Sequence, residues 1–270
     1  MSKKKIFIDP GHGGVQPGAC KGKRKESDDV LRLSLKVAEC LKEQNCEVKL
    51  SRTANKTVSI TARCKEANKW GAAYFLSIHR NSGKNTATGN EIWVHSKADA
   101  DTVARAKGIV DALCEADGLK NRGVKKGAVS YADYGVNKNT SMPSALLEVG
   151  FISNTSDNKV FDTKLDSMAL AIAKGLLKAV GEEYEEPKKD DFFPERGYFK
   201  KGDVSENIGK IAAFMRRVFP SYTDKKALGN TYGPYLISAV TEFQKRKGLE
   251  PDGCFGPLTL AKLEKHGFKR

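Results

Sequence analysis

The sequence predicts an α/β protein with a largely parallel sheet, followed by a small helical domain. From residue 5 to about residue 180, strand-like apolar runs alternate with amphipathic helical patterns. This alternation is typical of sheets whose parallel strands are joined by helices. The composition then changes to prolines and blocks of like charge, and a shorter helical stretch ends the chain. A length of 270 residues suits one domain of ordinary size and a smaller one.

The first strand and the first helix have clear signals. Residues 6–8, Ile-Phe-Ile, are a short strand run that breaks at Asp9 and Pro10. A helix is expected over 28–45, because its first two residues are aspartates at the positive end of the helix dipole. Its apolar residues also recur three and four positions apart, at Val30, Leu33, Val37 and Leu41.

The remaining elements of the first domain follow from the same signals. Strands are recognised by aromatic and β-branched residues, and helices by apolar residues at helical spacing before a glycine or a polar cap. In order, these are strand 46–52, helix 59–71, strand 72–79, strand 91–96, helix 99–117, a basic loop at 119–127, strand 144–152 and a helix over about 165–180.

The C-terminal part begins with a linker. Residues 181–197 contain two prolines and blocks of like charge without a period, and we place the linker at 183–197, between domains at 1–182 and 198–270. The last domain contains an internal repeat, "YGPYLISAVTEFQ" and "FGPLTLAKLEKHG". In each copy Gly-Pro precedes a helix, with the proline at the first helical position, where its missing N–H costs nothing.

Composition limits the classes of function. No apolar run approaches the roughly 20 residues of a membrane span, and the apolar core of a signal peptide is absent after the N-terminal lysines. We therefore expect a chain made in the cytoplasm without a secretion signal, with its six cysteines reduced. The formal charge of +14 is spread over both parts, because residues 188–270 contain 17 basic and 10 acidic residues. Such a charge suits a polyanion, either nucleic acid or an anionic wall polymer.

A candidate site is found where strands end. In open α/β sheets ligands bind beyond the carboxyl ends of the strands, and His12, His79 and Glu148 fall at such positions. Glu26 stands just before the first helix. Two imidazoles and one carboxylate match the ligands of a catalytic zinc site, and the second carboxylate would then transfer protons.

Spacing alone leaves another interpretation open. The two histidines are far apart and no H-E-x-x-H motif joins them, so both could be solvated loop residues, with Glu148 paired to a nearby Lys or Arg. A carboxylate inside the apolar run "ALLEVGFI" is costly, however, because an unpaired buried charge destabilises a fold by several kcal/mol. A nearby metal would compensate it. His95 and His266 lack any partner motif, and we expect no function for them.

Six segments carry a specific resemblance. They are "IDPGHGGVQPGA", "KESDDVLRLSLKVAECL", "SRTANKTVSITARCKEAN", "YFLSIHRNS", "NRGVK" and "MPSALLEVGFISN", which occur in this order between residues 5 and about 180. Together they resemble the zinc-dependent N-acetylmuramoyl-L-alanine amidases of the amidase-3 family. In the tail, "FQKRKGLEPDGCFGP" and its surroundings resemble the three-helix peptidoglycan-binding module.

The resemblance implies a fold and a reaction. The fold is a mixed, mostly parallel sheet flanked by helices, followed by a small three-helix domain. The reaction is hydrolysis of the amide between the lactyl group of N-acetylmuramic acid and L-alanine. By this resemblance His12, Glu26 and His79 are ligands of Zn²⁺, and Glu148 is the catalytic carboxylate.

Two positions depart from the family pattern. Arg80 replaces a residue that is usually small, and Ser27 stands where a lysine is common. We expect Arg80 to bring a fixed positive charge close to the cleft and to contact the substrate, together with Asn81, Asn121 and Arg122. Arg52 and Arg63 are expected to fix the packing of helices on the sheet.

The expected role is that of a lytic enzyme. We expect a monomer that acts on bacterial peptidoglycan after release from the cytoplasm, as a phage endolysin does, with anionic wall polymers as further ligands and with neither nucleic-acid binding nor membrane insertion. A bacterial autolysin for mother-cell lysis is the first alternative. The second is a catalytically inactive protein that binds the wall or another polyanion. Against it stand the four expected site residues and the lack of clustered aromatic residues for stacking bases.

Overall fold

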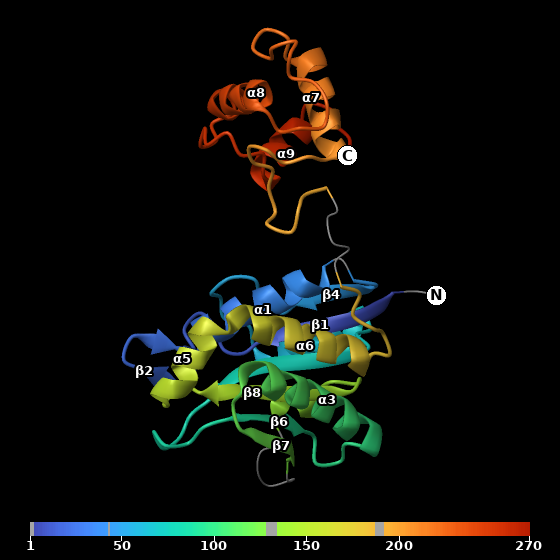
Figure 1. Cartoon of the computed structure of the whole chain (residues 1–270). Coiled ribbons are helices and arrows are strands. Elements are labelled where there is room, and N and C mark those ends of the chain that lie inside the picture. The colour runs from blue at the N-terminus through green and yellow to red at the C-terminus, as the bar shows by residue number, and fades with distance from the viewer. Residues whose placement is uncertain (1–2, 43, 128–133, 187–191) are drawn as a thin grey trace. The chain divides into compact units, whose positions relative to one another are not determined.

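The chain folds into two compact units, Met1–Glu186 and Pro187–Arg270. They are seen in a computed structural model, which describes residues 3–42, 44–127, 134–186 and 192–270 (Figure 1). No helix in these ranges is long and apolar enough to cross a membrane. All six cysteines are free in the structure.

A six-stranded sheet forms the centre of the first unit. Its strands, in spatial order, are β4 (Cys46–Leu50), β1 (Lys4–Pro10), β5 (Tyr74–Asn81), β8 (Ser144–Phe151), β6 (Asn90–Val94) and β7 (Asn121–Lys126). All neighbouring pairs are parallel except β6 and β8, which are antiparallel. The predicted fold class, a mostly parallel mixed sheet flanked by helices, is confirmed. The carboxyl ends of β1, β5 and β8 therefore lie side by side.

Helices cover both faces of this sheet. The unit contains α1 (Glu26–Leu41), α2 (Ile60–Trp70), α3 (Ala100–Asp117), α4 (Gly135–Lys138), α5 (Thr155–Thr163) and α6 (Leu165–Ala179). Figure 1 shows α1, α6 and α3 next to one another on one face, and α6 contacts both of its neighbours. The side chains of β1 alternate between the two faces of the sheet. Ile6 and Ile8 pack with these three helices, whereas Phe7 faces α2 and α4.

The structure differs from the sequence prediction at two elements, β7 and α5 (Thr155–Thr163). The basic stretch 119–127, expected to be a loop, contains β7, which pairs with β6 at the edge of the sheet. Its positively charged residues led to the prediction of a loop. Lysines are nevertheless common on edge strands, because they prevent pairing with the strands of another molecule. Helix α5 was not predicted. Only Asp157 and Phe161 are buried in it, so it has almost no apolar period, and it starts from the side-chain cap of Asn154.

The second unit is built from α7 (Glu206–Val218), α8 (Pro234–Arg246) and α9 (Pro257–Glu264). Both helices of the predicted repeat begin with Gly-Pro, as expected. The core is rich in aromatic residues and includes Phe199, Tyr232, Phe243 and Phe255.

The ends of the predicted linker 183–197 belong to the two units. Glu185 exchanges hydrogen bonds with the side chain of Gln44 in the first unit. Phe192 is buried in the core of the second unit.

Two helical glycines offer a test of how α3 and α6 pack. A Cβ at Gly175 would lie 2.9 Å from the Cα of Ile109, which is too close, whereas a Cβ at Gly108 would meet nothing within 4 Å. Gly175→Ala should therefore destabilise the first unit by about 1–3 kcal/mol, because the helices must move apart. Gly108→Ala should stabilise it by about 0.5–1 kcal/mol, since alanine favours helix. Denaturant unfolding of both variants checks the two signs, and a stabilised Gly175→Ala protein would contradict the packing described.

Candidate metal centre and catalytic cleft

The loop after β1 is fixed by two buried arginines. Arg52 donates from Nε to the carbonyl of Pro10 at 3.0 Å and from Nη2 to that of Gly11 at 2.7 Å. Arg63 donates to the carbonyls of Pro10 and His12, both at 2.6 Å. These contacts hold His12 in a left-handed conformation with φ of 56°, which non-glycine residues adopt rarely. The two arginines, expected to fix helix packing, thus bind the loop itself.

Asp9 compensates the charge of Arg63. Its buried carboxylate accepts from Arg63 Nη1 at 2.6 Å and from the hydroxyls of Ser51 and Ser77 at 2.5 and 2.7 Å. Every oxygen of this carboxylate therefore has a partner, which a buried ion pair requires. The end of β1 is anchored to the strand and helix beside it.

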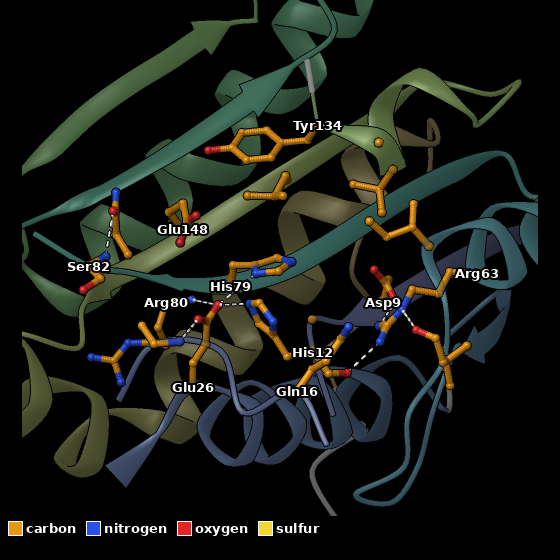
Figure 2. A pocket seen from close by; sticks show the side chains of 18 residues that line it. Asp9, His12, Gln16, Glu26, Arg63, His79, Arg80, Ser82, Tyr134 and Glu148 are labelled. Atoms are coloured by element: carbon orange, nitrogen blue, oxygen red, sulfur yellow. Dashed lines mark hydrogen bonds and ion pairs between the residues drawn. The ribbon is translucent and has the colours of Figure 1, made fainter. Parts of the chain in front are cut away.

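His12, Glu26 and His79 come together at the carboxyl ends of the strands. Glu26 Oε1 lies 3.1 Å from Nε2 of His12 and 2.8 Å from Nδ1 of His79. One ligand atom from each residue lies within 4.8 Å of the others, and Figure 2 shows the three side chains pointing toward one another. Ligands at the usual zinc distances of a tetrahedral site lie roughly 3.3 Å apart, so this donor set fits a zinc ion.

Backbone groups hold Glu26 in place. Its Oε2 accepts from the N–H of Ala19 at 2.8 Å, and Oε1 accepts from that of Arg80 at 3.1 Å. Burial by itself raises the pKa of Glu26, but hydrogen bonds from both imidazoles outweigh burial and bring the pKa below its usual range. Glu26 is therefore a charged carboxylate at neutral pH, as a metal ligand must be.

Glu148 lies beside the three ligands and has the opposite electrostatic character. It pairs in register with His79 of β5 on one side and with Glu91 of β6 on the other. Burial raises the pKa of Glu148 well above its usual value, and the negative charges of Glu26 and Glu91 raise it further, against the opposing effect of Arg80. Within the described residues its Oε2 is buried without a hydrogen-bond partner.

The ligands and Glu148 line a cavity of about 430 Å³. Asn81 and Ser82 extend its polar side, and Arg63 and Asp9 also reach it (Figure 2). Gln16 and Arg80 are also part of the lining, and an apolar wall is formed by Val58, Ile60, Tyr134, Val136 and Leu146. A metal site open to a cavity of this size has room for a substrate.

Sequence reasoning missed Glu91. Its buried carboxylate accepts from Asn81 Nδ2 at 2.9 Å, from Trp93 Nε1 at 3.0 Å and from Arg122 Nε at 2.6 Å. Two of the expected substrate contacts, Asn81 and Arg122, are therefore held by this carboxylate. Of the two, Asn81 lines the cavity. The signal was present, because Glu91 begins the apolar strand "EIWV" much as Glu148 interrupts another.

The structure places Arg80 among the residues that line the cavity, with its guanidinium buried. Its side chain is fully buried, donates to Asp29 at 2.6 Å and to Asn158 at 2.7 Å, and lies over the ring of Phe161. Its positive charge is therefore paired with Asp29 of α1. Contact between Arg80 and a substrate stays a prediction.

Asn121 and the other two histidines lie away from the cavity lining. Asn121 is exposed and donates to Asp111 at 2.7 Å. His95 accepts from the N–H of Lys97 at 3.0 Å, and His266 packs against Phe219 and Phe243 in the second unit. None of the three belongs to the cluster of potential metal ligands.

Comparison with known families decides the assignment of the first unit. The model of the family described as N-acetylmuramoyl-L-alanine amidase matches residues 6–178. The chain belongs to this amidase family. A second match, described as a putative peptidoglycan-binding domain, covers residues 222–263 in the tail. The resemblance seen in the sequence is thus confirmed for both parts, and the amidase is a peptidoglycan hydrolase with a wall-binding module.

Related proteins include bacterial and phage proteins. The amidase is 37% identical to N-acetylmuramoyl-L-alanine amidase CwlM of Bacillus licheniformis over 179 residues, which cover 65% of this chain and 68% of that protein. It is 36% identical to a sporulation-specific N-acetylmuramoyl-L-alanine amidase of Bacillus subtilis, also over 179 residues, which cover 65% of this chain and 68% of that protein. The endolysin of Bacillus phage SPP1 is 31% identical over 214 residues, covering 76% of this chain and 77% of the endolysin.

Solved structures support the same fold. An N-acetylmuramoyl-L-alanine amidase from Clostridium difficile 630 superposes with a TM-score of 0.62 at 30% identity, covering 67% of this chain and 98% of that one. The catalytic domain of CwlV from Bacillus (Paenibacillus) polymyxa gives 0.61 at 30% identity, with 67% and 99% covered.

Gly11 tests whether the three ligands must keep their positions. A Cβ at Gly11 would lie 2.3 Å from the ring of His79, so Gly11→Ala should displace this ring and lower metal affinity by roughly 10- to 100-fold, as changes next to a ligand commonly do. Metal titration of the purified amidase measures the effect. Gly83→Ala is the control, because its Cβ would meet only ordinary contacts at 3.5 Å, and equal affinities in both variants would refute the arrangement.

Proposed function

We propose that the amidase is a zinc enzyme in which His12, Glu26 and His79 hold the metal and Glu148 transfers protons. One observation carries the proposal: three potential ligand atoms lie within 4.8 Å of one another, beside a buried carboxylate oxygen of Glu148 for which the described part of the chain offers no hydrogen-bond partner. A zinc ion bound there would activate a water molecule and polarise the carbonyl of the scissile amide. The substrate is the bond between N-acetylmuramic acid and L-alanine.

Glu148 is suited to proton transfer because of its surroundings. A general base works best when its pKa lies near the working pH, and burial and two neighbouring carboxylates raise the pKa of Glu148 in that direction. Its Oε2 would accept a proton from the attacking water and then donate it to the leaving nitrogen of L-alanine. Glu26, whose pKa is lowered, remains charged and serves as a ligand.

We further propose that this amidase acts as a phage endolysin that reaches the wall after release from the host cytoplasm. The match to the phage SPP1 endolysin extends over 214 residues and so beyond the amidase domain, whereas the match to CwlM covers 179. A bacterial autolysin is the alternative, favoured by the higher identity to the two Bacillus amidases. Domains at 1–182 and 198–270 would supply catalysis and wall binding.

The reaction and the metal are tested on purified peptidoglycan. Hydrolysis of the muramyl amide should release free amino groups and no new reducing ends. A chelator should abolish release, and added Zn²⁺ should restore it. His79→Ala should lose the metal, because it removes one of three ligands. Release that persists in the chelated protein would exclude metal dependence.

The role of Glu148 is tested by Glu148→Gln. The amide cannot accept or release the proton, so turnover should fall by roughly 10²- to 10⁴-fold, while zinc content and the unfolding midpoint stay those of the unchanged protein. Turnover and metal content are measured on the same preparation. Near-normal turnover would assign proton transfer to another group, and loss of zinc would make Glu148 a ligand.

Cellular release is tested by producing the amidase inside Bacillus cells. Intact cells should continue to grow, because the membrane separates the enzyme from the wall. Permeabilising the membrane should then cause rapid loss of turbidity, and the Glu148→Gln protein is the matched control. Lysis that starts without permeabilisation would contradict dependence on a separate release step.

A further inference from the structure

The second unit contains a cavity of its own, of about 620 Å³. Two segments line it, 196–198 and 244–259. Tyr198 and Leu258 contribute apolar surface that is unusually exposed, at 37% and 75%. Glu250 and Asp252 lie on the same lining and are exposed. The cavity therefore combines an open apolar surface with carboxylates.

The fold holds the two segments rigidly together. Phe199 and Phe255 exchange backbone hydrogen bonds of 2.9 and 3.0 Å, and this bridge brings Tyr198 next to Gly256, where an added Cβ would lie 3.6 Å from that of Tyr198. The buried side chain of Gln244 fixes the opposite segment. Its Nε2 donates a hydrogen bond to the carboxylate of Asp252 at 2.8 Å, and its Oε1 accepts one from the N–H of Gly253 at 2.9 Å. A cavity with walls held in this way needs little ordering when a ligand binds.

The internal repeat shows that exposed apolar residues alone do not make such a cavity. Tyr235 occupies the position after Gly-Pro in the first copy that Leu258 occupies in the second. It is exposed to a similar degree as Tyr198, at 42%, but it is not among the residues that line the cavity. The first copy thus provides a matched surface within the same unit.

The charge of the lining restricts the ligand. The tail has 17 basic and 10 acidic residues between 188 and 270, yet among the described residues the charged ones that line the cavity are Glu250, Asp252 and Arg196. The guanidinium of Arg196 is already paired with Asp203. The lining is therefore acidic within a basic unit, and it would repel an anionic wall polymer.

We propose that this cavity binds the N-acetylated glycan strand of peptidoglycan. Sugar rings present an apolar C–H face that packs on Tyr198 and Leu258, while their hydroxyl and amide N–H groups donate to Glu250 and Asp252. The inference rests on the proposed function of the whole chain as a wall hydrolase, and it assigns the binding function of the tail to named residues.

The test compares matched variants of the full chain, all with Glu148→Gln so that the wall is not digested. Tyr198→Ala and Leu258→Ser should each weaken cosedimentation with peptidoglycan stripped of anionic polymers by roughly tenfold, the loss expected for one side chain that is no longer covered. Tyr235→Ala and Leu228→Ser remove exposed side chains of the same two residue types that are not among the residues lining the cavity, and these variants should bind normally. Equal binding by the two sets would overturn the proposal.

A soluble probe identifies the ligand chemistry. The N-acetylglucosamine tetramer should compete with wall binding and should shift amide resonances of residues 196–198 and 256–259, whereas a stem tripeptide should do neither. Competition by the tripeptide alone, or binding only to walls that retain anionic polymers, would refute a glycan site. Unfolding midpoints of the four variants confirm that each protein is folded.

Parallel assays separate this proposal from the proposed amidase activity. Tyr198→Ala in the otherwise unchanged chain should cleave soluble muropeptides at the normal rate, because the cavity lies in the other unit. If the unchanged chain fails to cleave them, the amidase proposal fails while the cosedimentation result still decides the glycan site.

Discussion

The site depends on the contact between two buried guanidinium groups and the carbonyls of the loop after β1. A loop that ends a central strand has backbone carbonyls without strand partners, and leaving such groups buried and unpaired costs free energy. Arg52 and Arg63 satisfy three of them. The same contacts stabilise the left-handed conformation of His12. Asp9 balances Arg63, and breaking a buried pair of this kind generally costs about 3–5 kcal/mol. Buried hydrogen bonds therefore determine the position of His12, the first of the three potential metal ligands.

The arrangement of the sheet gives two glutamates opposite properties. Glu26 begins α1 and meets two imidazoles and two backbone N–H groups, which favour its charged form. Glu148 lies on β8 between His79 and Glu91, where burial and like charge favour its neutral form. Two carboxyl groups whose surroundings move their pKa values apart are typical of enzymes that need both a fixed charge and a mobile proton. The negative charge of Glu91 raises the pKa of Glu148 and so increases the difference between the two pKa values. Glu91 also accepts a hydrogen bond from Asn81 and holds it at the cavity.

The sequence reveals elements and residues with strong local signals. His12, His79 and Glu148 were found from the predicted ends of strands, because ligands of α/β sheets bind beyond the carboxyl ends of the strands. Features that depend on distant partners were not visible. β7 is defined by its pairing with β6, and the burial of Arg80 depends on Asp29 and Asn158. Glu91 had a local signal at the start of an apolar strand, but its three donors lie on different strands. The spacing of residues along one chain does not show which strands become neighbours.

The two units solve different parts of one physical problem. A hydrolase that acts on an insoluble polymer is limited by how often it meets its substrate. A binding module linked to the hydrolase keeps it near the polymer and so raises the local concentration of substrate. The module can bind weakly and still be effective, because even modest affinity holds the catalytic unit near many equivalent bonds. A neutral glycan repeats regularly along the wall, whereas stem peptides are the groups that the amidase removes. Binding the glycan would leave the module attached after each cleavage, so that one encounter supports several turnovers.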